Sequence, residues 1–173
     1  LLKHLAAWWQ TTHFVDRVFY FGYDEKAHTP QQILHAIAKE LLGEADYHSQ
    51  FTPLSPQAGQ QMLAQRLRGE AHLLILDNLE SVTGASLAVP NTLSEAERTE
   101  LKSFLAELAG GKTSVLLGSR GEERWLVETR AGERPALHED DVYELPGLDE
   151  QAASALPARI LEAHAVCRPR GDP

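Results

Sequence analysis

The sequence predicts an α/β fold in which helices cover both faces of a mostly parallel sheet. Segments with strand character alternate along the chain with segments of helical periodicity. In addition, residues 73–76 (LLIL) are a continuous apolar run, which is typical of a strand covered on both faces in a parallel sheet, and residues 114–118 (SVLLG) predict the next buried strand. Such sheets bind their ligands beyond the carboxyl ends of the strands, so functional residues are expected there.

The first third of the chain predicts two helices with a strand between them. Apolar side chains at spacings of three and four indicate a helix that begins at or before residue 1, in which Trp8 and Trp9 are expected to pack against the fold. Residues 15–23 are rich in β-branched and aromatic side chains and predict a strand. Thr29, Pro30 and Gln32 form a capping box with a proline at the first helical position, and the helix that they begin ends near Gly43.

The following elements are marked by similar signals. Residues 44–54 are expected to form a polar connection, and Ser55 then caps a helix that runs to Gly69. The strand at residues 73–76 follows, and after a loop at 84–91 Ser94 and Glu97 form a second capping box. Beyond the strand at 114–118 we expect a short final strand at 142–148 and a last helix from about Asp149.

Composition excludes several classes of protein. The 173 residues carry 16 Lys and Arg against 25 Asp and Glu, a net charge of −9, and the basic residues form no stripe that would bind nucleic acid directly. No apolar run reaches the length of a membrane-spanning helix, so no membrane partner is expected. A single cysteine, Cys167, forms no internal disulfide and favours a cytoplasmic protein.

The stretch GGKTSVLLGSR (residues 110–120) contains some residues of a phosphate-binding loop but has neither the spacing nor the flanking elements of that motif. A GxxxxGK[ST] loop follows a strand and precedes a helix, and its first glycine would stand at Ala106. Here a helix precedes the glycines and a strand follows them. Gly110 and Gly111 are therefore predicted to end a helix as a left-handed cap.

The candidate site lies after two predicted strands. Asp77 directly follows the apolar run 73–76, where a carboxylate suits a magnesium ion that bridges nucleotide phosphates. Glu80 is a candidate to orient or deprotonate a water, assisted by Asn78. An aspartate in this place is also common as the cap of a turn, so the segment alone leaves both interpretations open.

Ser119 and Arg120 end the second apolar strand at the same expected edge of the sheet. The guanidinium of Arg120 is suited to contact a terminal phosphate, and both residues are candidates to bind the cofactor. An arginine at a strand end is otherwise simply solvated.

Taken in order, these segments resemble the nucleotide-binding module of the STAND NTPases, the NB-ARC and NACHT-like branch of the AAA+ P-loop ATPases. Residues 73–81 (LLILDNLES) resemble the Walker B segment, and residues 114–120 (SVLLGSR) resemble a sensor 1 strand that ends in arginine. Residues 142–156 resemble the strand and helix that close the core, and residues 1–9 resemble the helix that follows GK[ST]. The resemblance spans nearly the whole chain.

The resemblance implies a three-layer α-β-α P-loop NTPase core at residues 1–163, with residues 164–173 beginning a linker. It implies a nucleotide-dependent switch in signal transduction that binds ATP or ADP with Mg²⁺, hydrolyses ATP slowly and oligomerises with other subunits when activated. Asp77 is then expected to hold magnesium, Glu80 and Asn78 to act on water, and Arg120 with Ser119 to contact the γ-phosphate.

The sequence departs from the family pattern at one essential point. It contains no Walker A loop, which by this alignment lies upstream of Leu1 together with the first strand. The chain is therefore expected to be a segment of a longer protein that alone neither folds well nor binds ATP. Two alternatives remain open: a degenerate scaffold that binds other proteins without turning over nucleotide, and the NTPase module of a transcription regulator.

Overall fold

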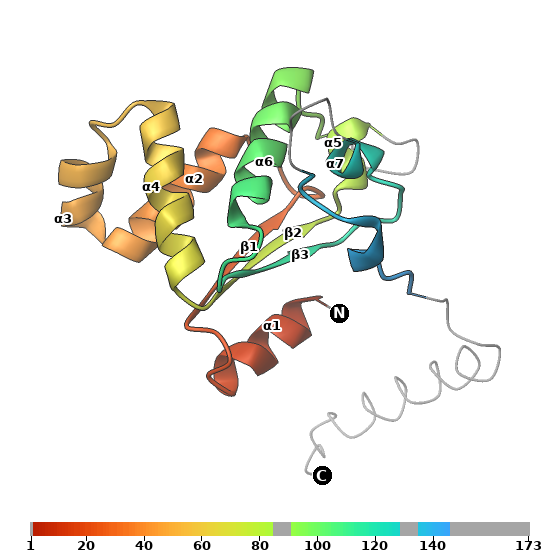
Figure 1. The fold of residues 1–173 in the computed structure, drawn as a ribbon, viewed down its shortest axis with the longest axis horizontal. Helices are drawn as coiled ribbons and strands as arrows, with labels where there is room; N and C mark the ends of the chain where they lie inside the picture. Colours follow the sequence, from red (N-terminus) through yellow and green to blue (C-terminus); the bar gives the residue numbers. More distant parts are fainter. Residues whose placement is uncertain (1, 85–90, 129–134, 146–173) are drawn as a thin grey trace, which may run out of the picture. The chain divides into compact units, whose positions relative to one another are not determined.

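Three parallel strands form the sheet at the centre of the fold (Figure 1). They are β1 (Arg17–Gly22), β2 (His72–Asp77) and β3 (Ser114–Leu117), and they lie in the order β1-β2-β3. The central strand β2 pairs in parallel with both neighbours. The mixed α/β class and the parallel sheet are thereby confirmed for three strands. The prediction that the strand at 114–118 is buried is corrected, since every residue of β3 is only partly buried.

The structure is a computed structural model that describes residues 2–84, 91–128 and 135–145. The chain divides into two units, residues 1–140 and 141–173, and the second is described for residues 141–145. The predicted last helix and the predicted boundary after residue 163 lie outside the described residues.

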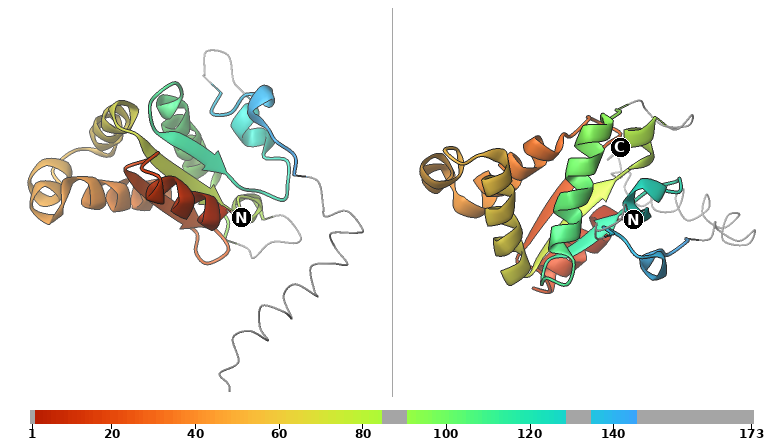
Figure 2. Two further views of the ribbon diagram at one scale, coloured as in Figure 1. Left: turned by 90° about the horizontal axis from the view of Figure 1, so that it is seen from below. Right: turned by 45° about the horizontal axis from the view of Figure 1, so that its top comes forward.

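Helices cover both faces of the sheet. On one face, α1 (Leu2–Thr11) packs Ala6 and Trp9 against Leu73 and Ile75. On the other face, three longer helices pack against Leu74 and Leu76 in a larger apolar cluster; they are α2 (Pro30–Leu42), α4 (Pro56–Gly69) and α6 (Glu95–Leu108). In the view from below in Figure 2, α1 lies in front of the strands. Because successive side chains of a strand point to opposite faces, the run 73–76 is buried throughout.

The helix starts predicted at Thr29, Ser55 and Ser94 are confirmed. Thr29 and Ser94 each cap a helix with a complete capping box, and Ser55 accepts a hydrogen bond from the backbone N–H of Ala58. Gly110 has a φ of +71°, as predicted for the turn that ends α6. Gly111 lies against α4, and a Cβ there would be 2.8 Å from the Cα of Arg68. The two glycines therefore end α6 and allow the chain to pass close to α4.

The connection predicted at residues 44–54 is largely helical, which corrects the prediction. A short turn, α3 (Glu44–Asp46), leads into a single π-helical turn at Tyr47–Phe51. Phe51 is buried, and its ring lies about where a side chain on Gly59 of α4 would lie. Tyr47 stacks on Phe51, with ring centroids 5.9 Å apart. Two aromatic anchors order this segment, although most of its residues are polar.

Two further expectations are corrected. The described part of the predicted final strand, residues 142–145, has no strand structure, since no described strand pairs with it. In α1, Trp9 packs against the fold but Trp8 is 62% exposed, because the narrow face of one helix leaves the adjacent position in solvent. The remaining short helices are α5 (Glu80–Thr83), α7 (Arg124–Val127) and a 3₁₀ turn at Glu139–Asp141. Within the described residues, no helix is long and apolar enough to cross a membrane.

Candidate functional site

The carboxyl ends of β2 and β3 are joined by backbone hydrogen bonds. The N–H of Gly118 donates to the carbonyl of Leu76 at 2.8 Å, and the N–H of Leu79 donates to the carbonyl of Gly118 at 3.0 Å. These bonds continue the pairing of the strands beyond their ends. The two segments that the sequence marks as candidate sites therefore lie side by side at one edge of the sheet.

Asp77 is half-buried and held by two donors. The Tyr20 hydroxyl donates to Asp77 Oδ2 at 2.8 Å, and the backbone N–H of Asn78 donates to Oδ1 at 3.0 Å. The pKa of the Tyr20 phenol is raised, mainly by burial and to a smaller extent by the hydrogen bond to Asp77 and the negative charge of Asp77. The phenol therefore keeps its proton and acts as the donor. The carboxylate is thus fixed in orientation at the edge of the sheet.

Asn78 adopts the left-handed conformation, with a φ of +57°. Asparagine tolerates this region better than most side chains, and residues held there cluster at functional sites. The turn at Asn78 leads into α5, whose first residue, Glu80, lies within hydrogen-bond distance of Ser119 and Arg120 after β3.

Glu80 is a buried carboxylate, 3% exposed, that forms an ion pair with Arg120. The Arg120 Nε donates to Glu80 Oε1 at 2.8 Å, and the Arg120 backbone N–H donates to Oε2 at 3.2 Å. Burial alone would raise the pKa of Glu80, but the hydrogen bonds and charge of Arg120 outweigh it and lower that pKa. Glu80 is therefore ionised, and it is a weak base while Arg120 is bound to it.

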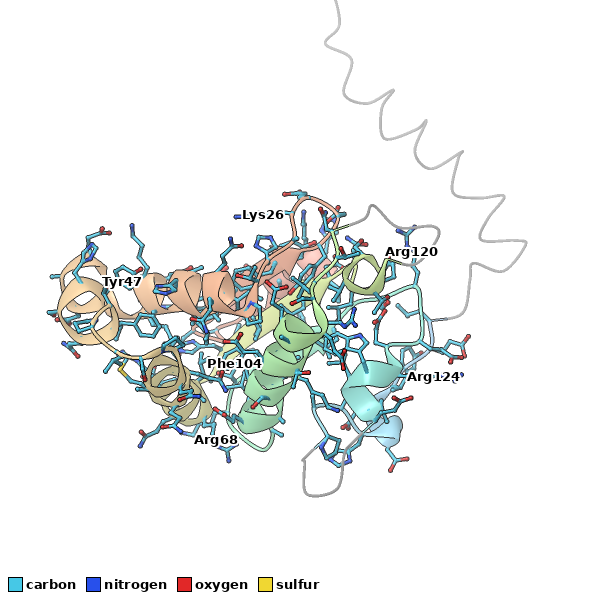
Figure 3. The ribbon with its side chains drawn as sticks, turned by 90° about the horizontal axis from the view of Figure 1, so that it is seen from above. Lys26, Tyr47, Arg68, Phe104, Arg120 and Arg124 are labelled. Carbon is cyan, nitrogen blue, oxygen red and sulfur yellow. The ribbon has the colours of Figure 1, made fainter. Side chains whose placement is uncertain are left out.

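Arg120 combines this anchor with an open side chain. The side chain is 72% exposed, and Figure 3 shows it beside α5, the helix that carries Glu80. A guanidinium has five N–H donors, so an arginine anchored through Nε keeps others for an anionic ligand.

Ser119 extends the cluster toward α7. Its hydroxyl lies 2.7 Å from Glu123 Oε1 and 3.3 Å from Glu80 Oε2, and one hydroxyl proton serves one of these carboxylates at a time. Glu123 also accepts the indole N–H of Trp125 at 2.6 Å. The Ser119 hydroxyl therefore bonds either to Glu80, the partner of Arg120, or to Glu123, the partner of Trp125.

The first turn of α1 faces the same edge of the sheet. A Cβ on Gly118 would lie 2.5 Å from Asp77 Oδ1 and 2.8 Å from Leu2 Cδ1, so glycine allows all three to approach closely. The Lys3 ammonium lies 4.7 Å from the centroid of the Tyr20 ring. The amino end of a ten-residue helix and one lysine are therefore close to Asp77, and both attract anions.

The structure gathers the predicted site residues into two adjoining clusters. Glu80 accepts hydrogen bonds from both Ser119 and Arg120, whereas Asp77 and Asn78 form the neighbouring cluster with Tyr20. The sequence reasoning missed Tyr20 and Lys3. The strand alternation of residues 17–22 places Tyr20 on one face, but its contact with Asp77 depends on a strand that lies 57 residues further along the chain.

The residues present fit a magnesium-bound phosphate ligand. In the described part of the chain no group of three His, Cys, Asp or Glu residues is placed to hold a metal. Mg²⁺ is commonly bound in proteins by one or two carboxylates together with substrate phosphates and water, and a single fixed aspartate meets that requirement. Asp77 is the residue that would hold the ion.

Comparisons with known proteins give no match. No family model matches the chain, and neither a curated protein nor a solved structure is significantly similar to it.

Proposed function

We propose that this chain is the nucleotide-binding module of a STAND-type P-loop NTPase and acts as an ATP- and ADP-dependent switch with magnesium. The proposal depends on one observation. Asp77 ends β2 and Arg120 follows its parallel neighbour β3, so both lie at one carboxyl edge, which the first turn of α1 also faces. A carboxylate for a magnesium ion, a cation for a phosphate and a helix amino end form a combination suited to a nucleoside triphosphate.

The residues would divide the work as follows. Asp77 would hold Mg²⁺, which when bound neutralises charge on the phosphates. Arg120 would contact the terminal phosphate, with Ser119 beside it, and Asn78 would shape the turn between the two clusters. Glu80 would orient water once Arg120 turns from its carboxylate to the phosphate.

The Glu80–Arg120 ion pair would respond differently to ATP and to ADP, as a nucleotide-dependent switch requires. A ligand shifts a conformational equilibrium only through contacts that differ between the two states. A terminal phosphate competes with Glu80 for Arg120, whereas a diphosphate that ends short of Arg120 leaves the pair intact. ATP would then favour an open, oligomerising state and ADP a closed one.

Calorimetry with Mg-ATP and Mg-ADP tests the proposal. It should be run on residues 1–173 and on a longer chain extended by any residues that the gene encodes upstream of Leu1. We expect Asp77→Ala to weaken magnesium-dependent binding at least about tenfold, and Arg120→Ala to reduce the preference for ATP over ADP by roughly 10- to 100-fold. Nucleotide at 100 times its Kd should raise the free energy of unfolding by about 2.7 kcal/mol.

Two control variants match these substitutions. Asp16 is an exposed aspartate before β1, at the opposite edge of the sheet, and Arg124 is an exposed arginine paired with exposed Glu122. Asp16→Ala and Arg124→Ala should bind nucleotide as the unchanged chain does. If both chain lengths unfold cooperatively but neither binds nucleotide, the module is a scaffold for protein interactions instead.

A further inference from the structure

Tyr20 reaches Asp77 across the sheet along a diagonal. In the register of β1 and β2, Tyr20 lies opposite Ile75 and Gly22 lies opposite Asp77. The Tyr20 hydroxyl nevertheless donates to Asp77 Oδ2 at 2.8 Å, so the ring leans two residues along the strand toward the carboxyl edge.

Gly22 provides the room for this lean. A Cβ on Gly22 would lie 3.3 Å from Tyr20 Cε1, so the ring would have to shift by a few tenths of an ångström, and 3.5 Å from the Tyr20 hydroxyl, an ordinary contact distance. The position directly opposite Asp77 thus has no side chain, and the phenol occupies that space.

The contacts of Tyr20 hold its ring on both sides. It belongs to the apolar cluster beneath α1, and the Lys3 ammonium covers its face at 4.7 Å. The phenol and the Asn78 backbone N–H bind different oxygens of Asp77, which fixes the plane of the carboxylate. Each carboxylate oxygen has a second lone pair, so the two donors orient the group without filling it.

We propose that Tyr20 is a positioning residue for the proposed magnesium–nucleotide site, in which its hydroxyl holds the Asp77 carboxylate in the orientation that receives the ion. This inference rests on the proposed function. The competing interpretation is that the hydrogen bond stabilises the fold alone. The two differ in one observable, because only a positioning role changes the magnesium concentration that nucleotide binding requires.

The test is a titration of the longer chain with ATP at increasing magnesium concentrations, in which calorimetry measures the binding of ATP. Tyr20→Phe keeps the ring and removes the hydroxyl. We expect the magnesium concentration for half-maximal ATP binding to rise about tenfold, with magnesium-independent binding of ATP unchanged. Tyr23→Phe is the matched control, since Tyr23 follows the same strand and its hydroxyl donates to the His28 carbonyl. It should leave the magnesium requirement unchanged.

Gly22→Ala is a second variant that displaces the ring without removing the hydroxyl. Its Cβ also approaches Asp24 Oδ1, the end of an exposed side chain that can move away. A smaller shift of the magnesium requirement in the same direction is expected. An unchanged requirement in both Tyr20→Phe and Gly22→Ala overturns the inference, as does an equal shift in Tyr23→Phe.

Asp77→Asn separates failure of the inference from failure of the proposed function. If Asp77→Asn abolishes the magnesium dependence but Tyr20→Phe does not alter it, the function stands and the inference falls. If the unchanged chain binds ATP equally with and without magnesium, or does not bind it, both fall.

Discussion

At the scale of single residues, the site has two features that are unfavourable on their own, the backbone conformation of Asn78 and the buried charge of Glu80. Asn78 occupies a backbone region that side chains with a Cβ seldom enter, and Glu80 is a buried charge whose partner Arg120 is exposed. Each arrangement costs free energy unless its surroundings compensate, so each makes a measurable prediction.

Asn78 is expected to be replaceable by glycine but not by a β-branched residue. Asn78→Gly should leave the unfolding free energy within about 0.5 kcal/mol, whereas Asn78→Val should lower it by about 1–2 kcal/mol, because the left-handed conformation places its Cβ close to the backbone. Urea denaturation measures both. Equal stability of the two variants would show that the turn relaxes out of the left-handed region.

Glu80 is expected to make stability depend on acid pH. Its pKa in the fold lies below the ordinary value of 4.5, so the stability it contributes is present above that value and is lost as pH falls through the lower, folded value. The difference in unfolding free energy between the unchanged chain and Glu80→Gln should be constant from pH 7 to 5 and shrink below about pH 4.5. Glu122→Gln, at a carboxylate whose ion pair with Arg124 is exposed, is the control and should change the unfolding free energy at pH 7 much less than Glu80→Gln does.

At the scale of elements, the helix starts depend on local chemistry and were therefore predictable. The capping boxes of α2 and α6 satisfy backbone donors that lie three residues apart, and the sequence shows both partners. The turn at Tyr47–Phe51 was not predictable in this way, because Phe51 is held by a contact with Gly59 on another helix. Polar composition alone suggested a loop.

Removal of one cap should destabilise the chain by a limited amount. The Ser94 hydroxyl accepts the Glu97 backbone N–H, and the Ser94 N–H donates to Glu97 Oε2 at 2.8 Å. Ser94→Ala is expected to cost about 0.5–2 kcal/mol in thermal or urea unfolding, and Ser94→Asp much less, since aspartate also caps. Ser49→Ala is a control at an exposed serine inside the π-helical turn. A loss for Ser94→Asp as large as for Ser94→Ala would contradict the capping explanation.

At the scale of the whole molecule, β2 joins the two apolar clusters. Its residues alternate between the cluster beneath α1 and the larger one beneath α2, α4 and α6. The class of the fold was predictable because this double burial leaves a continuous apolar run. The site was predictable only in part: Asp77, Glu80 and Arg120 follow strands, whereas Tyr20 reaches Asp77 through the pairing of β1 with β2.

Substitutions on opposite faces of β2 should weaken the same unfolding transition. Leu74 and Ile75 are fully buried in different clusters. Leu74→Ala and Ile75→Ala are each expected to lower the unfolding free energy by about 2–5 kcal/mol, in a single transition observed by circular dichroism and hydrogen exchange. If one variant instead produced a separate early transition, the two faces would unfold independently.

The hydrogen bond between Trp125 and Glu123 also gives the molecule an optical reporter. The emission of an indole responds to charge near its ring, and the Glu123 carboxylate that binds Trp125 competes for the Ser119 hydroxyl proton with Glu80, the partner of Arg120. The other two tryptophans, Trp8 and Trp9, lie in α1 and can be replaced by phenylalanine. The resulting protein would have Trp125 as its single tryptophan. The wavelength and intensity of its emission should change when Arg120 leaves Glu80 for another partner, without an added dye.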